Sequence, residues 1–480
     1  CLPHSSESRC LRHFSYRTNR LIMLSRRSLR CLRAFHAGKT VPETFVRASR
    51  LLQPSASTKS DAKQALCKSQ KLMLDHGLIS STGPGTFALL PLAVKALERL
   101  VNLIDSELQQ IGGQKTYFPC LVPSTLFKKT GRLDKLGQEL FVLKDRKDHD
   151  YCLGPTHEEA VTQLVTSLKT LPHASLPLML YQITPKFRDE ARPKFGLLRG
   201  REFIMKDMYS FDKTVEEAAG TYNLVCDAYM RILQQLEVPF VKVKASTGAM
   251  GGSYSHEFHF LNDIGEDHLH VCTQCQTGLS VDEVGSGCEN GTCENCGGHL
   301  QEARGIEVAH AFCLGTTYSK LLSATTQHAD GKNRPFEMNC FGIGVTRLLA
   351  ACLEMLASED RMRWPLSIAP FRVAVITPKR GSHEVGSLPL AEHLAGQLGS
   401  LDQLRGAVII DDRDDWTIGK RLKDLDTLGT PYIIVAGKKT KEPVPLFELY
   451  DALGGSTAEL THSELLHFFQ FGPLAVKRIY

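Results

Sequence analysis

The chain has 480 residues, of which 42% are hydrophobic, enough for two or three domains with apolar cores. No apolar run approaches the ~18 residues of a membrane-spanning helix, so the sequence predicts no membrane protein. The formal net charge of +5 is unevenly distributed: residues 1–60 contain twelve basic and two acidic residues, and the remainder contains 45 basic and 50 acidic residues.

The first 60 residues are rich in arginine and serine, and the apolar residues from Leu21 to Phe35 are spaced for one face of a helix. This composition is typical of a mitochondrial transit peptide, with a nucleic-acid-binding basic tail as the alternative. We therefore expect residues 1–60 to lie outside the folded domains and the protein to act in the mitochondrial matrix.

An amphipathic helix is predicted from Leu92 to Ile111, with Pro91 at its start and Gly112 at its end. The apolar segment 116–123 follows and predicts a strand. Pro119 within it favours an edge position or a subunit contact, because proline cannot donate to a sheet ladder.

The next segment of interest is GPTHEE at residues 154–159. Thr156 and Glu159 have the spacing of a helix capping box, which gives those two residues a structural explanation. Glu158 is not explained in this way, although an acid in a first helical turn is favoured by the helix dipole.

Residues 186–211 predict a charged β-hairpin whose tip runs from Arg192 to Gly196. Arginine stays charged in a protein site and can hold a phosphate by two parallel hydrogen bonds. The hairpin can therefore bind a polyphosphate beside a cationic partner, the alternative being a solvated, salt-bridged surface hairpin. Its charged residues are Arg188, Glu190, Arg199, Arg201, Glu202 and Asp207.

A helix is expected from Thr221 to Glu237, followed by a glycine-bent strand near residue 254. His256, Glu257 and His259 alternate along that strand, which favours hydrogen bonding within a sheet over a metal site.

The chain has fifteen cysteines, most of which we expect to be buried thiols in a reducing compartment. Two C-x2-C pairs, separated by seventeen residues, have the spacing of a zinc ribbon, with free thiols as the alternative. Four thiolates fill a tetrahedral ion, so the predicted zinc would be structural. Its ligands would be Cys272, Cys275, Cys293 and Cys296.

The sequence GIGVTR ends at Arg347, in the first turn of a predicted apolar helix, where an arginine needs an anionic partner. A phosphate or a core carboxylate would serve. After a boundary at residues 364–370, strands and helices alternate in a predicted α/β domain. Its basic residues either contact phosphates or are solvated: Arg413, Lys420, Arg421, Lys423, Lys438 and Lys439.

Several of these segments, in order, resemble the motifs of class II aminoacyl-tRNA synthetases. The helix from Leu92 with the segment to Pro119 is similar to motif 1, FRDE and RGREF within 187–203 to motif 2, and GIGVTR to motif 3. GPTHEE, GGSYSHEF and RGIEVAH further resemble the bacterial-type prolyl-tRNA synthetases of mitochondria. The resemblance runs from about Lys68 to the C-terminus.

The resemblance implies an α+β fold, with an antiparallel catalytic sheet over residues 61–365 and an anticodon-binding domain over residues 366–480. It also implies a homodimer joined through motif 1. The implied activity is ATP- and Mg²⁺-dependent formation of prolyl-adenylate, followed by transfer of L-proline to tRNA(Pro).

The implied site residues follow from the same motifs. Arg188 would contact the α-phosphate and the proline carboxylate, Phe203 would stack on adenine, and Glu190 would bind the adenine amino group. Arg347 would act with Arg199 on the distal phosphates. The residues implied for proline are Thr156, Glu158, Arg188, Asp207 and His310, and those for ATP are Arg188, Glu190, Arg199, Phe203, Glu307 and Arg347.

The chain departs from the bacterial pattern between motifs 2 and 3. Only about 30 residues, including the cysteine segment 271–298, lie between His270 and Arg304, too few for an editing domain. A pocket for proline cannot strongly exclude the smaller alanine by binding alone. We therefore expect that the protein does not itself hydrolyse alanyl-tRNA.

Two other functions stay open at this level. Threonyl and seryl synthetases share motifs 2 and 3, although the loop at Thr156 favours proline. A synthetase-like accessory protein without activity would be expected to have lost arginines that this chain retains: Arg188, Arg199 and Arg347.

Overall fold

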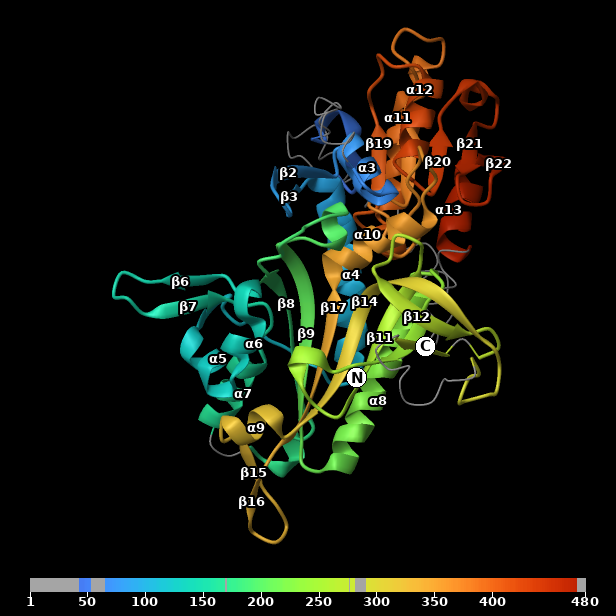
Figure 1. Ribbon diagram of the computed structural model, residues 1–480. Helices are drawn as coiled ribbons and strands as arrows, with labels where there is room; N and C mark the ends of the chain where they lie inside the picture. The colour runs from blue at the N-terminus through green and yellow to red at the C-terminus, as the bar shows by residue number, and fades with distance from the viewer. Residues whose placement is uncertain (1–42, 53–64, 169–170, 276, 281–290, 473–480) are drawn as a thin grey trace, which may run out of the picture.

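The computed structural model describes residues 43–52, 65–168, 171–275, 277–280 and 291–472. The chain forms a large sheet domain and, beyond Trp364, a smaller α/β domain, which lies above the sheet domain in Figure 1. This architecture confirms the predicted α+β fold. None of the helices in the described ranges is long and apolar enough to cross a membrane.

The larger domain is built on a nine-stranded, mostly antiparallel sheet. Its longest strand, β14, pairs with β12 along its first part and with β11 and β17 along its second part. Across the sheet the strands are β11 (Tyr254–Leu261), β10 (Val241–Ala245), β13 (Thr277–Ser280), β12 (Asp267–Cys272), β14 (Leu300–Gly315), β17 (Glu337–Gly344), β9 (Glu202–Asp212), β8 (Leu178–Phe187) and β4 (Gln114–Lys115).

The charged hairpin lies within this sheet rather than on the surface. β8 and β9 pair from Leu178 opposite Phe211 to Phe187 opposite Glu202, and β17 continues the sheet beside β9. Lys186 in β8 is fully buried. The alternative of a solvated hairpin is therefore wrong for the arms, and exposed side chains lie toward the tip, as at Arg192.

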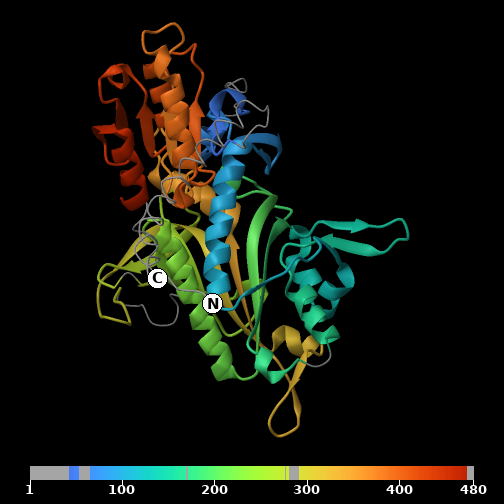
Figure 2. The same ribbon diagram turned by 180° about the vertical axis from the view of Figure 1, so that it is seen from behind.

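Helices cover the rear face of the sheet, which Figure 2 shows from behind. The predicted helix α4 begins at Pro91, and its apolar stripe, including Leu100 and Ile104, is fully buried. α8 begins before the predicted Thr221, because the Thr214 hydroxyl accepts the Glu217 N–H and caps the helix. The helices of this layer are α3 (Lys68–Asp75), α4 (Pro91–Gln110), α8 (Val215–Gln235) and α10 (Val345–Leu356).

The predicted strand at 116–123 is wrong as a single element. β4 ends at Lys115, at the edge of the large sheet, and β5 (Leu121–Pro123) belongs to a different, three-stranded sheet. Proline has no N–H group for a ladder. Next to Pro119, the Phe118 N–H donates to the side chain of Gln182 at 3.0 Å instead of to a neighbouring strand.

The predicted capping box is also wrong. α7 (Glu158–Ser167) begins after His157, and no side chain caps it. The Thr156 hydroxyl donates to the Glu158 carboxylate at 2.7 Å, whereas Glu159 accepts a hydrogen bond from Arg132. Glu159 thus binds the buried Arg132 instead of forming the predicted capping box with Thr156.

Smaller elements surround the large sheet. The three-stranded sheet and α5, α6 and α7 form a lobe to one side of the large sheet (Figure 1). Outside α7 and β5, these elements are β2 (Ile79–Gly83), β3 (Thr86–Leu89), α5 (Ser124–Thr130), α6 (Arg132–Leu136), β6 (Val142–Lys144), β7 (Asp150–Leu153), α9 (Thr317–Leu321), β15 (Thr325–Gln327) and β16 (Asn333–Pro335).

The C-terminal domain has the predicted alternation of strands and helices. Three strands, β18, β19 and β20, are parallel, and two antiparallel strands follow them. In sheet order the strands are β1 (Val46–Arg47), β19 (Val408–Asp411), β18 (Val373–Ile376), β20 (Tyr432–Val435), β21 (Leu446–Asp451) and β22 (Ser456–Thr461), with α11 (Leu388–Gly399), α12 (Ile418–Thr427) and α13 (His462–Phe471).

Residues 43–52 belong to this domain, which corrects the expectation that residues 1–60 lie outside the fold. β1 pairs in parallel with β19. Arg47 forms ion pairs of 2.8 Å with Glu43 and 2.9 Å with Glu392, and the Ser49 hydroxyl donates to Asp412 at 2.8 Å. Amino-acid composition alone does not reveal a strand of only two residues such as β1. The other residues of the transit-peptide prediction, 1–42 and 53–60, lie outside the described residues.

Candidate active site

A cavity of ≈ 300 Å³ lies on the front face of the large sheet. Neighbouring residues of a strand point to opposite faces. In β9, Lys206 contacts Tyr229 of α8 behind the sheet, whereas Asp207 lines the cavity. Toward the hairpin tip lies a wider hollow of ≈ 810 Å³, and Arg188 and Arg347 line both spaces.

Arg188 brings a positive charge to the cavity without a paired carboxylate in the described part of the chain. It directly follows β8, and its guanidinium carbon lies 5.3 Å from the centre of the Phe203 ring. Burial and the nearby charge of Arg347 lower the pKa of Arg188. Arginine nevertheless stays charged in proteins, so this end of the cavity favours an anion.

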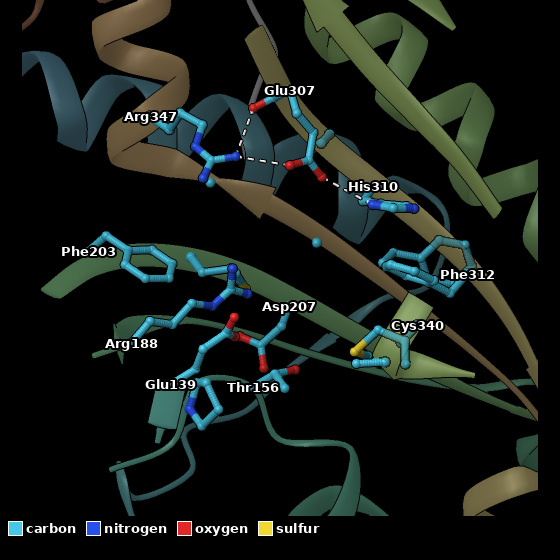
Figure 3. Close-up of a pocket in the computed structure, with 18 of the residues that line it drawn as sticks. Glu139, Thr156, Arg188, Phe203, Asp207, Glu307, His310, Phe312, Cys340 and Arg347 are labelled. Carbon is cyan, nitrogen blue, oxygen red and sulfur yellow. Dashed lines mark hydrogen bonds and ion pairs between the residues drawn. The ribbon is translucent and has the colours of Figure 1, made fainter. Parts of the chain in front are cut away.

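Arg347 is anchored at the first turn of α10 and faces Arg188 across the cavity (Figure 3). Its Nε donates to the Leu198 carbonyl at 2.9 Å, and its Nη1 donates to Glu307 Oε2 at 3.0 Å. The sequence allowed either a phosphate or a core carboxylate as the anionic partner of Arg347, and the structure pairs it with the carboxylate of Glu307. That carboxylate lines the cavity, so the pair is not buried in the core.

Glu307 is held between two basic groups. Its Oε1 lies 3.1 Å from His310 Nδ1, while Arg347 occupies Oε2. Burial disfavours the Glu307 charge, but the hydrogen bond with His310 and the Arg347 charge together hold the pKa of Glu307 below its usual range. Glu307 is therefore an anion at neutral pH.

The opposite end of the cavity is acidic. The Thr156 hydroxyl and Arg132 Nη1 both donate to the Glu158 carboxylate, at 2.7 and 2.8 Å. Arg132 also pairs with Glu159 at 3.1 Å. These charged groups are nearly inaccessible, with Arg132 at 3% exposure and the two glutamates at 1% or less. This end therefore favours a cation.

Asp207 lies next to the acidic end of the cavity and is linked to it by hydrogen bonds. Its carboxylate pairs with Lys186 at 2.7 Å and accepts hydrogen bonds from Gln182 at 2.9 Å and from the Tyr209 hydroxyl at 2.7 Å. The Tyr209 hydroxyl lies 3.2 Å from the Thr156 hydroxyl. With three partners and 3% exposure, Asp207 positions Tyr209 and Thr156 more readily than it could bind a ligand itself.

A narrow aromatic wall closes the cavity between its charged ends. His310 and Phe312 are alternate residues of β14, and their rings stack with centres 3.7 Å apart. Cys340 of β17 lines the cavity near them (Figure 3). A wall of this kind suits a compact aliphatic ring.

The rim at the hairpin tip is an ion-pair cluster. Arg199 pairs with Glu190 at 2.9 Å and also with Glu266, and Lys194 reaches Glu266 as well. These side chains are partly exposed. Another anion can therefore replace Glu190 or Glu266 as the partner of Arg199 at little cost in free energy.

Comparisons with known proteins agree with this geometry. Residues 141–356 match the family model of the tRNA synthetase class II core domain (G, H, P, S and T), and residues 372–470 match that of an anticodon binding domain. A probable mitochondrial proline–tRNA ligase of Rattus norvegicus is 47% identical over 451 residues, which cover 92% of this chain and 94% of the rat protein. The chain belongs to the proline–tRNA ligase family of class II aminoacyl-tRNA synthetases.

Other members of the proline–tRNA ligase family are similar over most of the chain. The probable mitochondrial enzyme of Homo sapiens is 48% identical, with coverage of 86% of this chain and 88% of the human protein. A solved Giardia lamblia prolyl-tRNA synthetase in complex with prolyl-adenylate has a TM-score of 0.69 at 19% identity. That match covers 83% of this chain and 75% of the Giardia chain, and it shows a shared fold.

In this proline–tRNA ligase, motifs 2 and 3 contribute residues to one cavity, whereas motif 1 lies outside its lining. Motif 2 is the β8–β9 hairpin, motif 3 is β17 with α10, and motif 1 is α4 with β4. The cavity brings together every residue predicted to contact proline or ATP: Thr156, Glu158, Arg188, Glu190, Arg199, Phe203, Asp207, Glu307, His310 and Arg347.

Sequence reasoning missed several residues of this proline–tRNA ligase site. Arg132 lies in the five-residue helix α6, where no periodicity or motif marks it. Phe312 and Cys340 occupy ordinary apolar strand positions. Arg132 is one of three charged residues in that five-residue helix, and this sequence context does not indicate burial.

The four predicted cysteines come together away from the cavity, where β12, β13 and β14 meet. Their sulfur atoms all lie within 4.8 Å of one another, with Cys272 3.5 Å from Cys296 and Cys275 3.6 Å from Cys293. Thiolates on a tetrahedral zinc ion are about 3.8 Å apart at ordinary Zn–S lengths. The four residues therefore fit zinc.

Proposed function

We propose that this protein ligates L-proline to tRNA(Pro) in an ATP-dependent reaction that passes through prolyl-adenylate. The observation that carries the proposal is the separation of charge within one cavity, with Arg188 and Arg347 at one end and Glu158 at the other. L-proline presents a carboxylate and a cationic imino group, so it fits this polarity. The names of the relatives support the same amino acid.

In the first step, a proline carboxylate oxygen attacks the α-phosphorus of ATP. The bond from that phosphorus to the bridging oxygen breaks, and pyrophosphate leaves with the electron pair. Two anions must approach each other, so positioning and charge neutralisation carry most of the catalysis. We assign Arg188 to the α-phosphate and the carboxylate together, because a guanidinium can bind two oxygens in parallel.

The nucleotide is proposed to bind toward the hairpin tip. Phe203 would stack on adenine, and Glu190 would accept a hydrogen bond from its amino group. Arg199 and Arg347 would hold the distal phosphates, with Arg199 exchanging its exposed carboxylate partners for phosphate.

The proposed metals differ in role. Glu257, Glu307 and His310 offer ligand atoms within 4.8 Å of one another, and the two carboxylates are the hard ligands that Mg²⁺ prefers. When bound, Mg²⁺ supplies positive charge to the leaving pyrophosphate. The zinc proposed for the four cysteines would be structural, because four thiolates leave no position for substrate.

In the second step, a ribose hydroxyl at the tRNA 3′ end attacks the prolyl carbonyl and AMP leaves. We propose that residues 192–196 contact the acceptor end, that the C-terminal domain binds the anticodon, and that α4 and β4 join two subunits in a homodimer. Mitochondrial names among the relatives favour action in the mitochondrial matrix. Clearance of alanyl-tRNA is assigned to other proteins, and rapid deacylation by the purified protein would contradict this.

Pyrophosphate exchange tests the activity directly. Incubated with each amino acid in turn, the protein should form ATP from pyrophosphate with proline. Exchange with threonine or serine would instead indicate another synthetase of the class, and no exchange would indicate an accessory protein.

Arg188→Ala should abolish proline-dependent exchange, with a loss of about 10³-fold or more, because the two reacting anions lose their shared partner. tRNA binding, measured by filter retention, should change little. Arg192→Ala, an exposed arginine in the same hairpin, is the matched control and should retain exchange. Preserved exchange in Arg188→Ala would remove this residue from the mechanism.

A further inference from the structure

We propose that Arg132 and Glu159 set the charge of the amino-acid pocket, so that Glu158 meets the substrate in a buried cluster with one net negative charge. This inference rests on the proposed function, because it explains how that site selects a cationic amine. Arg132 and Glu159 are positioning residues, since they act on the substrate through Glu158.

The cluster is a three-membered ion network of nearly inaccessible side chains. Arg132 Nη1 donates to Glu158 Oε2 at 2.8 Å and to Glu159 at 3.1 Å. Glu159 also accepts a hydrogen bond from the Thr130 hydroxyl at 2.8 Å. One guanidinium thus serves two carboxylates, and the cluster keeps an unbalanced negative charge when both carboxylates are ionised.

The remaining surroundings of Arg132 are uncharged. Its guanidinium carbon lies 5.6 Å from the Tyr318 ring centre and 6.0 Å from that of Phe127, and Nη2 lies 3.3 Å from the sulfur of Met250. Burial and neighbouring carboxylates raise the pKa of Tyr318, which keeps its phenol neutral. No second cation in the described residues forms an ion pair with either glutamate.

The two carboxylates have different access to a ligand. Glu158 and Arg132 line the cavity, whereas Glu159 does not. A substrate amine can therefore contact Glu158 directly, whereas it interacts with Glu159 only electrostatically, without contact. A buried net charge is unfavourable, and a cation that completes the balance relieves that cost. The empty pocket is thus selective for one positive charge beside Glu158.

The pH dependence follows from the same cluster. Burial and the charge of Glu158 raise the pKa of Glu159, against the opposing effects of Arg132 and Thr130. When Glu159 takes up a proton as pH falls, the cluster becomes neutral and loses its attraction for the amine. The Michaelis constant for proline should then rise toward low pH, and Glu159→Gln should remove that rise.

The test is a charge-compensation cycle in proline-dependent pyrophosphate exchange. Cluster charge is −1 in the wild type, 0 in Glu159→Gln, −2 in Arg132→Met and −1 again in the double variant. Glu159→Gln should raise the Michaelis constant for proline about tenfold, an effect of the size expected for one charge at an effective dielectric near 20, and Arg132→Met, which makes the cluster more negative, should lower it. The double variant should return to within about threefold of the wild type.

A packing role predicts the reverse, namely a double variant at least as impaired as the worse single variant. That outcome would overturn the proposal. The Michaelis constant for ATP should stay constant in all variants and reports on folding of the remaining site.

An analogue without the cationic imino group separates charge from shape. Tetrahydrofuran-2-carboxylate has the proline ring with oxygen in place of the imino group and carries no positive charge. Its inhibition constant should be unchanged or lower in Glu159→Gln, while proline binds more weakly. Equal weakening of proline and the analogue would overturn the inference. Failure of the wild type to use proline at all would instead overturn the proposed function.

Discussion

Lys206 has its ammonium group fully buried behind the catalytic sheet. The ammonium contacts the Tyr229 hydroxyl and donates to the Phe341 carbonyl at 3.0 Å, and no carboxylate in the described part of the chain forms an ion pair with it. Burial lowers the pKa of Lys206 to about 7. The residue is therefore a source of pH-dependent stability that is separate from catalysis.

The pH dependence has a definite sign. Lysine in the unfolded chain keeps its proton up to about pH 10.4. Between pH 7 and that value the unfolded state binds more protons than the folded state, so this residue makes the free energy of unfolding rise with pH.

Lys206→Met should remove that contribution. The stability of the wild type relative to the variant should increase by about 2 kcal/mol from pH 7 to pH 9. Urea unfolding at several pH values measures this shift. The exposed Lys71→Met is the control and should give a pH-independent difference, and a constant difference for Lys206→Met would contradict the interpretation.

Among the elements, β12 and β14 connect the cysteine cluster to the active site. β12 runs from Asp267, beside the wider hollow, to Cys272, and β14 runs from Leu300 past Glu307 and His310. A metal at the cysteines would clamp the far ends of both strands. Loss of the metal is therefore expected to loosen the strand that carries Glu307.

Cys293→Ser should remove the proposed zinc and lower the thermal midpoint by about 2–4 °C, as expected for a ~1 kcal/mol loss in a domain of this size. Elemental analysis of the purified protein should give about one zinc per chain in the wild type and far less in the variant. Cys120→Ser lies outside the cluster and should retain the metal. A wild type without metal would contradict the assignment.

Long elements and motif residues could be predicted from the sequence. Predictions failed where contacts between distant parts of the chain determine the local structure. α4 has an unbroken apolar stripe and ends within one residue of its predicted bounds at both sides. The capping box at Thr156 failed because Arg132, from another element, binds Glu159. Arg132 itself could not be predicted, since its burial depends on Phe127 and on Tyr318, which is distant in sequence.

At the scale of the whole molecule, two arginines of the C-terminal domain that the sequence offered as phosphate contacts are held within the fold. Arg421 is fully buried, and Arg413 is paired with Asp411 at 2.7 Å and Asp424 at 2.8 Å. These two arginines are therefore structural rather than candidate phosphate contacts. Two lysines of α12, Lys420 and Lys423, are exposed.

Lys420→Ala with Lys423→Ala should weaken tRNA binding and leave proline-dependent exchange unchanged, because exchange does not involve tRNA. The salt dependence of tRNA binding should fall by roughly one unit of slope for each phosphate that is no longer neutralised by a lysine. Binding measured at several salt concentrations gives that slope. Lys71→Ala, at an exposed lysine on α3 in the larger domain, is the control. An unchanged slope in the double variant would exclude α12 from the interface.

The parallel pairing of β1 with β19 also constrains when the domain can form. Ser49 and Asp412, which are hydrogen-bonded, are 363 residues apart in the chain. Such a distant contact is slow to form, since the intervening chain must be available first. A chain that emerges or is translocated from its N-terminus therefore delivers β1 early and its partner late. During that interval β1 lacks β19 and Arg47 lacks Glu392, so the C-terminal sheet closes only after almost the whole chain has arrived.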